Sequence, residues 1–226
     1  MHQRWENLLF LHWSVSQSDL QPTLPAGLTV DACDGNGYVG LSPFFLRNLR
    51  PPWLPPLPGL SNFLELNVRT YVKDASGVPG IWFFSLDCNQ PLGVLGARMW
   101  LGLPYQLASM RAVQNGETKF TSRRKGSREW ARYRYRAAGP ALETDPLTLE
   151  FFLLERYYLF SKRTHSGPLL RVQVKHQPYQ FHEAIVDEWS TLPIQQDGFP
   201  SVHSAPVHAC VVDGFDVKVF GSENIL

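Results

Sequence analysis

The sequence predicts a mainly β fold, a β-rich α+β domain, and three observations lead to that prediction. The 226 residues include 18 Pro and 17 Gly, so turns are frequent and long helices are few. Aromatic residues make up 13% of the chain, a composition typical of strands and pocket walls. Residues alternate strictly over 62–72, which is the pattern of one strand with two different faces.

No internal repeat or abrupt change of composition divides the chain, so residues 1–226 are expected to form a single domain. From the N-terminus, residues 5–15 fit either a first strand or a short helix. Asp-Gly and Asn-Gly pairs between 28–32 and 38–45 predict a hairpin of two strands. Five prolines within 51–59 exclude a helix or a central strand and favour an extended connector. Such a connector would also suit a cover over a cavity mouth or, less well, a ligand for a proline-recognition module.

The remaining elements follow from the same local signals. Residues 81–87 are apolar on both faces until their end, so we expect this strand in the centre of the sheet, beside 62–72. Further strands are expected at 109–113 and 117–122 as a hairpin, 130–137 as an edge strand with a charged outer face, 157–161 and 169–176 as a second hairpin, 207–212 and 215–220. Two short helices are expected at 94–102 and 147–155, the second after the helix-start signal Asp145-Pro146.

The strand over 62–72 carries a row of polar side chains on one face. Glu65, Asn67, Arg69 and Tyr71 lie two residues apart, so they project from the same side of the strand. Such a face is either half solvated or lines a polar cavity inside a curved sheet. In a cavity, Arg69 would clamp a carboxylate, with Glu65 orienting the guanidinium. Asn67 and Tyr71 would add hydrogen bonds, and the alternative is a purely structural polar network.

Two further candidates follow from the expected pairing of 62–72 with 81–87. Asp87 ends the second strand, and Arg98 lies in the helix expected nearby. Both would reach the same cavity as Arg69 if the two strands pair. The alternative for Asp87 is an ion pair with an arginine that fixes a loop.

Several function classes lack their motifs in this sequence. The seven histidines show no HxH or HExxH spacing, so we predict no metal site and no cofactor. A G-x-S-x-G elbow, a phosphate-binding P-loop and a glycine-rich dinucleotide motif between a strand and a helix are all missing. Three widely spaced cysteines disfavour a disulfide framework, and neither a signal peptide nor a membrane-spanning stretch is recognisable. A cytoplasmic protein without membrane contact is therefore expected.

The segment 119–136 holds eight of the 21 basic residues and a single acid, Glu129. With Trp130, Tyr133 and Tyr135 interleaved, it would suit nucleic-acid binding through phosphate contacts and base stacking. A solvated strand edge is the favoured interpretation, because such charge runs commonly protect exposed edges. Nucleic acid is therefore a disfavoured partner.

Eight motifs spread over nearly the whole chain resemble those of the YqjF-like domain family, a family of unknown function. They are Leu9–Trp13, Tyr38–Phe44, Phe63–Val72, Phe83–Asp87, Ala97-Arg98, Leu103–Tyr105, Glu155–Tyr157 and His176. That family is in turn similar to acetoacetate decarboxylase, which implies an antiparallel, closed or cone-like β-barrel around a buried cavity. On this resemblance the strand over 62–72 lines the lumen.

The resemblance also implies a change of chemistry. In the decarboxylase, an arginine is followed six residues later by Pro-Lys-Lys, and the first lysine forms a Schiff base with the substrate. Here Arg98 and Pro104 keep that spacing, but Tyr105 stands where the first lysine would be. The nearest lysines are Lys73 and Lys119. Schiff-base decarboxylation is therefore expected to be lost while the cavity is kept, with Tyr105 able to donate a hydrogen bond or transfer a proton.

The sequence thus predicts a protein that binds a small polar or anionic organic molecule, a carboxylate or keto acid, in the barrel cavity. Two alternatives stay open. One is a non-covalent lyase, isomerase or hydrolase that uses Tyr105 and Glu65 as catalytic residues; the other is a nucleic-acid or protein interaction module on the 119–136 surface. Homo-oligomerisation is also left open. The predicted ligand-binding residues are Arg69, Tyr71, Asn67, Arg98 and Asp87.

Overall fold

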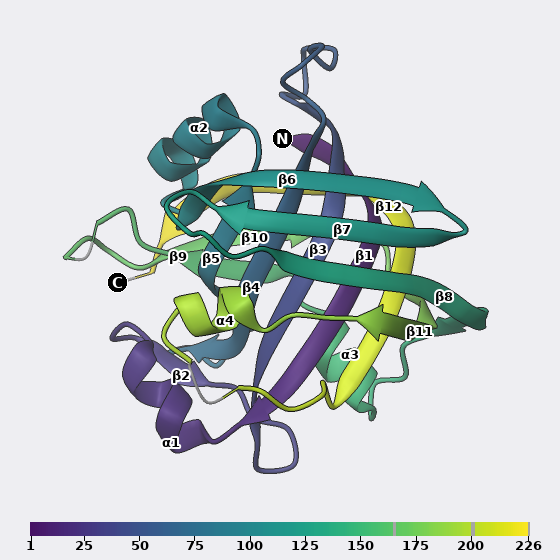
Figure 1. Cartoon of the computed structure of the whole chain (residues 1–226). Coiled ribbons are helices and arrows are strands. Elements are labelled where there is room, and N and C mark those ends of the chain that lie inside the picture. The colour runs from purple at the N-terminus through teal and green to yellow at the C-terminus, as the bar shows by residue number, and fades with distance from the viewer. Residues whose placement is uncertain (165, 200–201, 226) are drawn as a thin grey trace.

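The computed structural model describes residues 1–164, 166–199 and 202–225, with the side chains of 95–98 and 100 also outside the description. Over these residues, the strands form one twelve-stranded, mostly antiparallel sheet that curls round on itself (Figure 1). The strands are β1 (His2–Val15), β2 (Leu28–Val30), β3 (Gly37–Arg50), β4 (Phe63–Asp74), β5 (Pro79–Cys88), β6 (Tyr105–Asn115), β7 (Glu117–Arg124), β8 (Ala131–Glu143), β9 (Tyr158–Ser161), β10 (Leu170–Lys175), β11 (Gln180–Glu188) and β12 (His208–Asn224). The short helices are α1 (Gln17–Leu20), the 3-10 turn η1 (Gln21–Thr23), α2 (Pro91–Leu101), α3 (Leu149–Leu154) and α4 (Leu192–Gln196).

Strand pairings close part of the sheet into a ring. β1 pairs with β12 and β3, β3 pairs with β4, and β4 pairs with β5. β5 runs parallel to β9, which pairs with β10, and β10 returns to β12. Seven strands therefore enclose an interior toward which alternate residues of each strand project.

The other strands after β5 form a second layer outside this ring. β6, β7, β8 and β11 lead from β5 back to β12 and cross in front of β1, β3 and β4 (Figure 1). One apolar cluster fills the space between the two layers. Its members include Trp13 of β1, Leu66 and Val68 of β4, and Phe120 and Tyr133 of the second layer. Burial of this surface holds the two layers together.

The strand predicted over 62–72 is confirmed as β4, and its two faces have different environments. Leu66 packs in the cluster between the layers, so Glu65, Asn67 and Arg69 project into the ring. Glu65 is 3%, Asn67 6% and Arg69 5% exposed, which excludes a half-solvated face. The predicted pairing of this strand with 81–87 is also observed, between β4 and β5.

Three predictions about the sheet are wrong. The predicted hairpin of 28–32 with 38–45 does not form, because β2 pairs with β4 and β3 lies between β1 and β4. The segment 130–137 is not an edge, because β8 pairs with β7 on one side and β11 on the other. The expected strands 207–212 and 215–220 are one continuous strand, β12. The Asp-Gly pair between them stays extended because β1 pairs along that stretch, with Glu6 opposite Gly214 and Leu8 opposite Val212.

Helix α3 begins later than the sequence predicted. Thr148 is the N-cap, and its hydroxyl accepts a hydrogen bond from the Phe151 amide at 3.3 Å. Asp145 instead closes the preceding turn, because its carboxylate accepts a hydrogen bond from the Leu147 amide at 3.2 Å. Sequence reasoning missed β11 and the short helices α1 and α4, which carry weak local signals.

None of the described helices is long and apolar enough to cross a membrane.

Candidate functional site

The ring encloses a cavity of about 400 Å³, called here the inner cavity. Among the described residues, four polar ones contribute to its wall: Gln3, Glu65, Asn67 and Tyr105. The rest of the described lining is mainly apolar and comes from β1, β3, β4, β5, α2, β9, β10 and β12. A largely apolar hollow with a few polar groups is the usual form of a small-molecule site.

Glu65 is the acid of the inner cavity, and no described cation pairs with its carboxylate. Desolvation raises the pKa of Glu65 to about 7, although hydrogen bonds from Tyr105 and Asn67 act in the opposite direction. The Tyr105 hydroxyl donates to Glu65 Oε2 at 3.0 Å. Burial and the neighbouring Glu65 raise the pKa of Tyr105 well above its ordinary value, so the phenol stays protonated. Glu65 can therefore take up or release a proton near neutral pH, with Tyr105 as a fixed donor beside it.

A second compartment of about 30 Å³ adjoins the inner cavity and is called here the arginine compartment. The two spaces share five wall residues, which are Trp5, Asn67, Phe83, Leu159 and Val174. Four buried polar atoms of its lining have no hydrogen-bond partner among the described residues: Trp5 Nε1, Ser42 Oγ, Asn67 Oδ1 and Arg69 Nε. Buried polar atoms are normally hydrogen-bonded, so their convergence on one small space marks a place for a polar group.

Arg69 brings an uncompensated positive charge to this compartment. Its Nη2 donates to the Tyr71 hydroxyl at 3.3 Å and to the Leu153 carbonyl at 3.4 Å. The guanidinium lies 4.8 Å from the Phe10 ring centroid. No described carboxylate lies within ion-pair distance of it. Neutral oxygens and an aromatic face therefore hold this charge in place.

A chain of hydrogen bonds runs from Arg69 toward the protein surface. The Tyr71 hydroxyl lies 2.7 Å from His12 Nε2, and His12 Nδ1 lies 2.9 Å from His208 Nδ1. A guanidinium only donates, so the Tyr71 hydroxyl accepts a hydrogen bond from Arg69. Its own O–H group then donates a hydrogen bond to His12 Nε2. Burial, with the charges of His208 and Arg69, lowers the pKa of His12 well below its ordinary value. With Tyr71 as the donor to Nε2, neutral His12 carries its hydrogen on Nδ1 and donates it to His208 Nδ1.

The structure brings together five of the predicted site residues and separates one. Glu65, Asn67, Arg69 and Tyr105 line the inner cavity or the arginine compartment. The fifth, Tyr71, accepts a hydrogen bond from the Arg69 guanidinium. Asp87 belongs to neither lining and forms an ion pair with Arg124 at 2.8 Å. The side chain of Arg98, in α2, lies outside the described residues.

Sequence reasoning missed the site residues that other strands contribute. Trp5 and Gln3 come from β1, and Ser42 comes from β3, where it stands opposite Asn67. His12 lies within a motif that the sequence singled out, but its partner Tyr71 comes from a different strand. Only the strand register places these residues beside β4.

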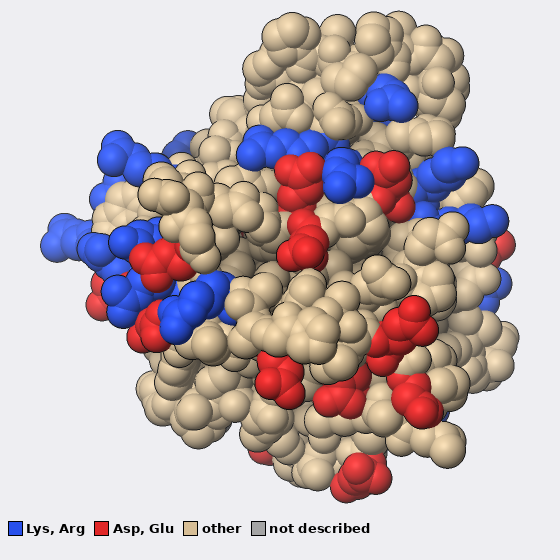
Figure 2. All heavy atoms as spheres, turned by 90° about the vertical axis from the view of Figure 1, so that its right-hand side faces the viewer, with Lys and Arg blue, Asp and Glu red and all other residues tan. Residues whose placement is uncertain are grey.

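The basic segment 119–136 forms part of the second layer. Arg124 is buried in ion pairs, Arg136 binds Asp187 at 2.8 Å, and the Arg123 guanidinium stacks 4.8 Å from the Trp130 ring centroid. On the face that Figure 2 shows, lysines and arginines lie at the left, across the upper part and at the right edge with acidic side chains among them, and the lower part shows mainly acidic side chains. Internal pairing therefore takes up part of the positive charge that the sequence displays.

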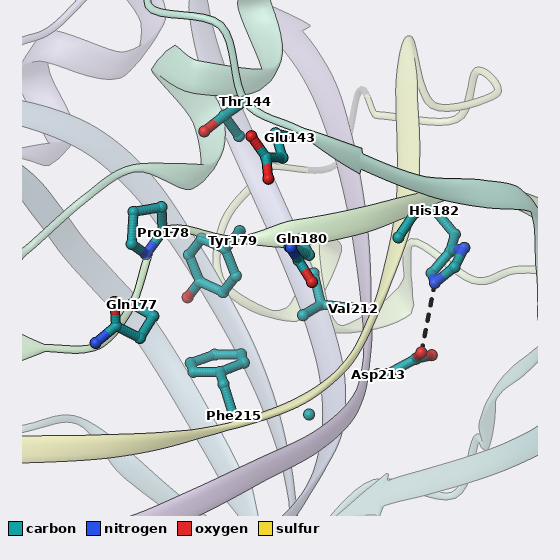
Figure 3. Close-up of a pocket in the computed structure, with 12 residues that line it drawn as sticks. Glu143, Thr144, Gln177, Pro178, Tyr179, Gln180, His182, Val212, Asp213 and Phe215 are labelled. Atoms are coloured by element: carbon teal, nitrogen blue, oxygen red, sulfur yellow. Dashed lines mark ion pairs between the residues drawn. The ribbon is translucent and has the colours of Figure 1, made fainter.

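A larger hollow, about 780 Å³, opens on the surface between β8, β11 and β12, and is called here the surface hollow (Figure 3). Its polar side chains include Glu143, His182 and Asp213. His182 Nε2 lies 3.4 Å from Asp213 Oδ2, and the Asp213 side chain is 76% exposed. The Asp213 carboxylate is therefore open to water, and it already has His182 as a partner.

Residues 2–216 match the model of the family DUF2071, described as an uncharacterized conserved protein. The chain belongs to the DUF2071 family. Over 186 residues it is 39% identical to the uncharacterized protein YqjF of Bacillus subtilis (strain 168), covering 81% of this chain and 76% of YqjF. The family resemblance predicted from the sequence motifs is therefore confirmed.

Several solved structures share this fold. The DUF2071 chain superposes on the enduracididine biosynthesis enzyme MppR complexed with pyruvate with a TM-score of 0.70 at 13% identity, covering 100% of this chain and 90% of MppR. For acetoacetate decarboxylase from Legionella pneumophila the TM-score is 0.69 at 14% identity, covering 100% and 87%. For an acetoacetate decarboxylase-like enzyme from Sphingomonas wittichii RW1 it is 0.68 at 14% identity, covering 99% and 92%. These likenesses show a shared fold and confirm the predicted fold class.

Proposed function

We propose that this protein binds a small organic carboxylate, keto acids included, inside the ring. The carboxylate would enter the arginine compartment and accept hydrogen bonds from Arg69 Nε and Trp5 Nε1. The rest of the molecule would fill the apolar inner cavity next to Glu65. One observation carries the proposal: a buried guanidinium without a described carboxylate partner faces a compartment of unsatisfied polar atoms. An unpaired buried charge is unfavourable, and an anionic ligand would balance it.

Two further observations support this class of ligand. The fold is shared with MppR complexed with pyruvate and with acetoacetate decarboxylase. Among the described side chains, no lysine lines the inner cavity, and Tyr105 holds a hydrogen bond to Glu65 there. We therefore infer that the ligand is held without a Schiff base.

Calorimetric titration with pyruvate, acetoacetate and butanoate tests the proposal. The wild type is compared with Arg69→Met and with Arg132→Met, which removes an exposed arginine from the second layer. Arg69→Met should weaken carboxylate binding by roughly 10- to 100-fold, the worth of a charge-assisted hydrogen-bond pair. Arg132→Met should bind like the wild type, and the neutral analogue butanamide should bind weakly to all three. Equal affinities of wild type and Arg69→Met would overturn the proposal.

A second candidate function is proton transfer at the bound keto acid, favoured by the pKa of Glu65 near 7. The Glu65 carboxylate would remove a proton from the carbon next to the ketone, leaving an enolate, and the carboxylic acid would return it. Tyr105 would donate a hydrogen bond and stay protonated. No co-reactant is needed for this exchange.

Incubation of acetoacetate or pyruvate in D₂O measures that step, because the proton signals next to the ketone disappear as deuterium enters. Wild type should accelerate the exchange over buffer, and Glu65→Gln should abolish the acceleration while butanoate affinity stays within about twofold. An exchange rate that is unchanged by Glu65→Gln would remove this second candidate.

A further inference from the structure

A third space, here named the vestibule, opens outside the inner cavity and measures about 810 Å³. Its walls are the connector 51–60, the start of α2 and the end of β12. Large apolar side chains on these walls are unusually exposed: Trp53 is 79%, Leu92 62% and Phe220 44% exposed. Contiguous exposed apolar surface on one hollow usually marks a binding surface.

The vestibule is continuous with the inner cavity. Both spaces share five wall residues, which are Met1, Leu49, Leu92, Gly93 and Val219. Gly93 belongs to both linings: a Cβ placed there would meet the Gln90 side chain at 3.3 Å and would lie 3.8 Å from Phe63 Cε1 in the inner wall. The five shared residues are apolar, so the described part of the lining offers an apolar route from the inner cavity to the surface.

The mouth of the vestibule is electropositive. Arg50 and Lys218 belong to its lining, and the described lining contains no Asp or Glu. Neither cation forms a described ion pair. Besides desolvation, the charges of Lys218 and Arg50 lower the pKa of the neighbouring His2. Positive potential at the entrance attracts anions and raises their association rate.

We propose that the natural ligand is an amphipathic organic acid with a long, unbranched apolar chain. Its carboxylate lies in the arginine compartment, its chain fills the inner cavity, and the end of the chain passes Gly93 into the vestibule. Arg50 and Lys218 steer the anion to the entrance and do not hold it in the bound state. The assignment rests on the proposed function, because Arg69 anchors the same carboxylate.

Titration with butanoate, octanoate, dodecanoate and hexadecanoate, each below its aggregation concentration, tests the chain length. Every methylene that becomes buried should raise affinity by about fourfold, so octanoate should bind on the order of 100-fold more tightly than butanoate. Affinity should continue to rise beyond octanoate as the chain enters the vestibule. A series that levels off at butanoate would overturn the chain proposal while leaving the proposed function intact. Failure of every acid to bind would refute both.

Gly93→Leu narrows the passage and separates the two spaces. This variant should still unfold cooperatively in urea, which shows that it folds, and should lose most of the additional affinity that the wild type gains from butanoate to hexadecanoate. Gly221→Leu is the matched control, because it adds the same bulk to the vestibule where a Cβ meets nothing within 4 Å. Hexadecanoate binding equal in wild type and Gly93→Leu would contradict the path.

The double variant Arg50→Gln, Lys218→Gln tests the orientation. Association of dodecanoate should become slower and less salt-dependent, while its dissociation rate stays within about twofold of wild type. Much faster dissociation would place the carboxylate at the mouth and overturn the proposed orientation.

Discussion

Arg69 is buried and the Arg124 side chain is only 15% exposed, yet their electrostatic surroundings are opposite. Arg124 Nε donates to Asp87 at 2.8 Å, Nη1 donates to Asp197 at 2.7 Å, and Nη2 donates to the Ser85 hydroxyl at 2.7 Å. Ser85 also donates a short hydrogen bond to Asp197. Two carboxylates therefore surround one guanidinium, and every donor group of that guanidinium has a partner.

Among the described residues, by contrast, Arg69 donates hydrogen bonds only to the Tyr71 hydroxyl and the Leu153 carbonyl, and its Nε has no hydrogen-bond partner. Glu65 on the same strand face likewise lacks a described cation. The comparison teaches that burial of charge alone does not identify a site in this protein. The distinguishing feature is a buried charge that has no described counter-ion and lies beside a cavity. Four predictions test this contrast, beginning with the largest effect.

Removing the two arginines should affect stability very differently. Arg124→Met should lower the free energy of unfolding by about 3–5 kcal/mol, because the Asp87 and Asp197 charges lose their partner. Arg69→Met should leave it unchanged or raise it, because no described carboxylate loses a partner. Urea unfolding of both variants at pH 7 measures the difference. Equal destabilisation would show that Arg69 is structural and would remove the contrast.

Glu65→Gln should change the pH dependence of stability. The folded pKa of Glu65 is about 7 against an ordinary 4.5, so between these pH values the folded protein keeps a proton that the unfolded chain releases. Stability therefore falls as pH rises from 4.5 to 7, by roughly 3 kcal/mol from this group. The amide removes that loss, so the stability difference between variant and wild type should grow in favour of the variant from pH 5 to pH 8.

Urea unfolding at the two pH values measures this linkage. Burial also raises the pKa of Asp87 to about 6, despite the opposing effect of Arg124, but that group is present in both proteins and cancels in the comparison. Identical pH slopes for wild type and Glu65→Gln would show that Glu65 ionises normally.

Tyr105→Phe should raise the pKa of Glu65 further, because the phenol stabilises the carboxylate through its hydrogen bond. One hydrogen bond to a charged group corresponds to about one pH unit. Carbon-13 NMR of the Glu65 carboxyl carbon follows the titration. Tyr133→Phe, which removes a hydroxyl bonded to the Ser190 carbonyl in the second layer, is the matched control and should leave it unchanged. A downward shift in Tyr105→Phe would reverse the assigned role.

Asp213→Asn should have the smallest effect. The surface hollow is larger than the inner cavity, about 780 against 400 Å³, but its ion pair is exposed to water. We expect a change within about 0.5 kcal/mol in stability and no change in butanoate affinity. Loss of butanoate binding in this variant would move the site to the surface hollow.

The inward row of β4 could be predicted because alternation within one strand determines both faces locally. Glu65, Asn67 and Arg69 follow directly from that rule. Trp5 and Ser42 could not be predicted, because they reach the site through the pairing of β1 with β3 and of β3 with β4. A local sequence pattern does not determine the register between strands that are distant in the sequence.

Asp87 and Arg124 illustrate the opposite failure. Asp87 was predicted at the cavity from its place at the end of a paired strand, and Arg124 was grouped with a charged, solvated run. The folding of the second layer brings Arg124 inward to Asp87, a contact that depends on the pairing of β6 with β7. The continuity of β12 and the inner position of β8 were missed for the same reason, since partner strands override local turn and charge signals.

The most direct test of the central claim is the Nε–Hε resonance of Arg69 in a nitrogen-15 spectrum during titration with butanoate. We expect a saturable shift of the Arg69 signal and no shift of the Arg124 signal, because Arg69 lines the arginine compartment whereas Arg124 Nε donates to Asp87. An Arg69 signal that stays fixed while butanoate binding saturates would contradict the account.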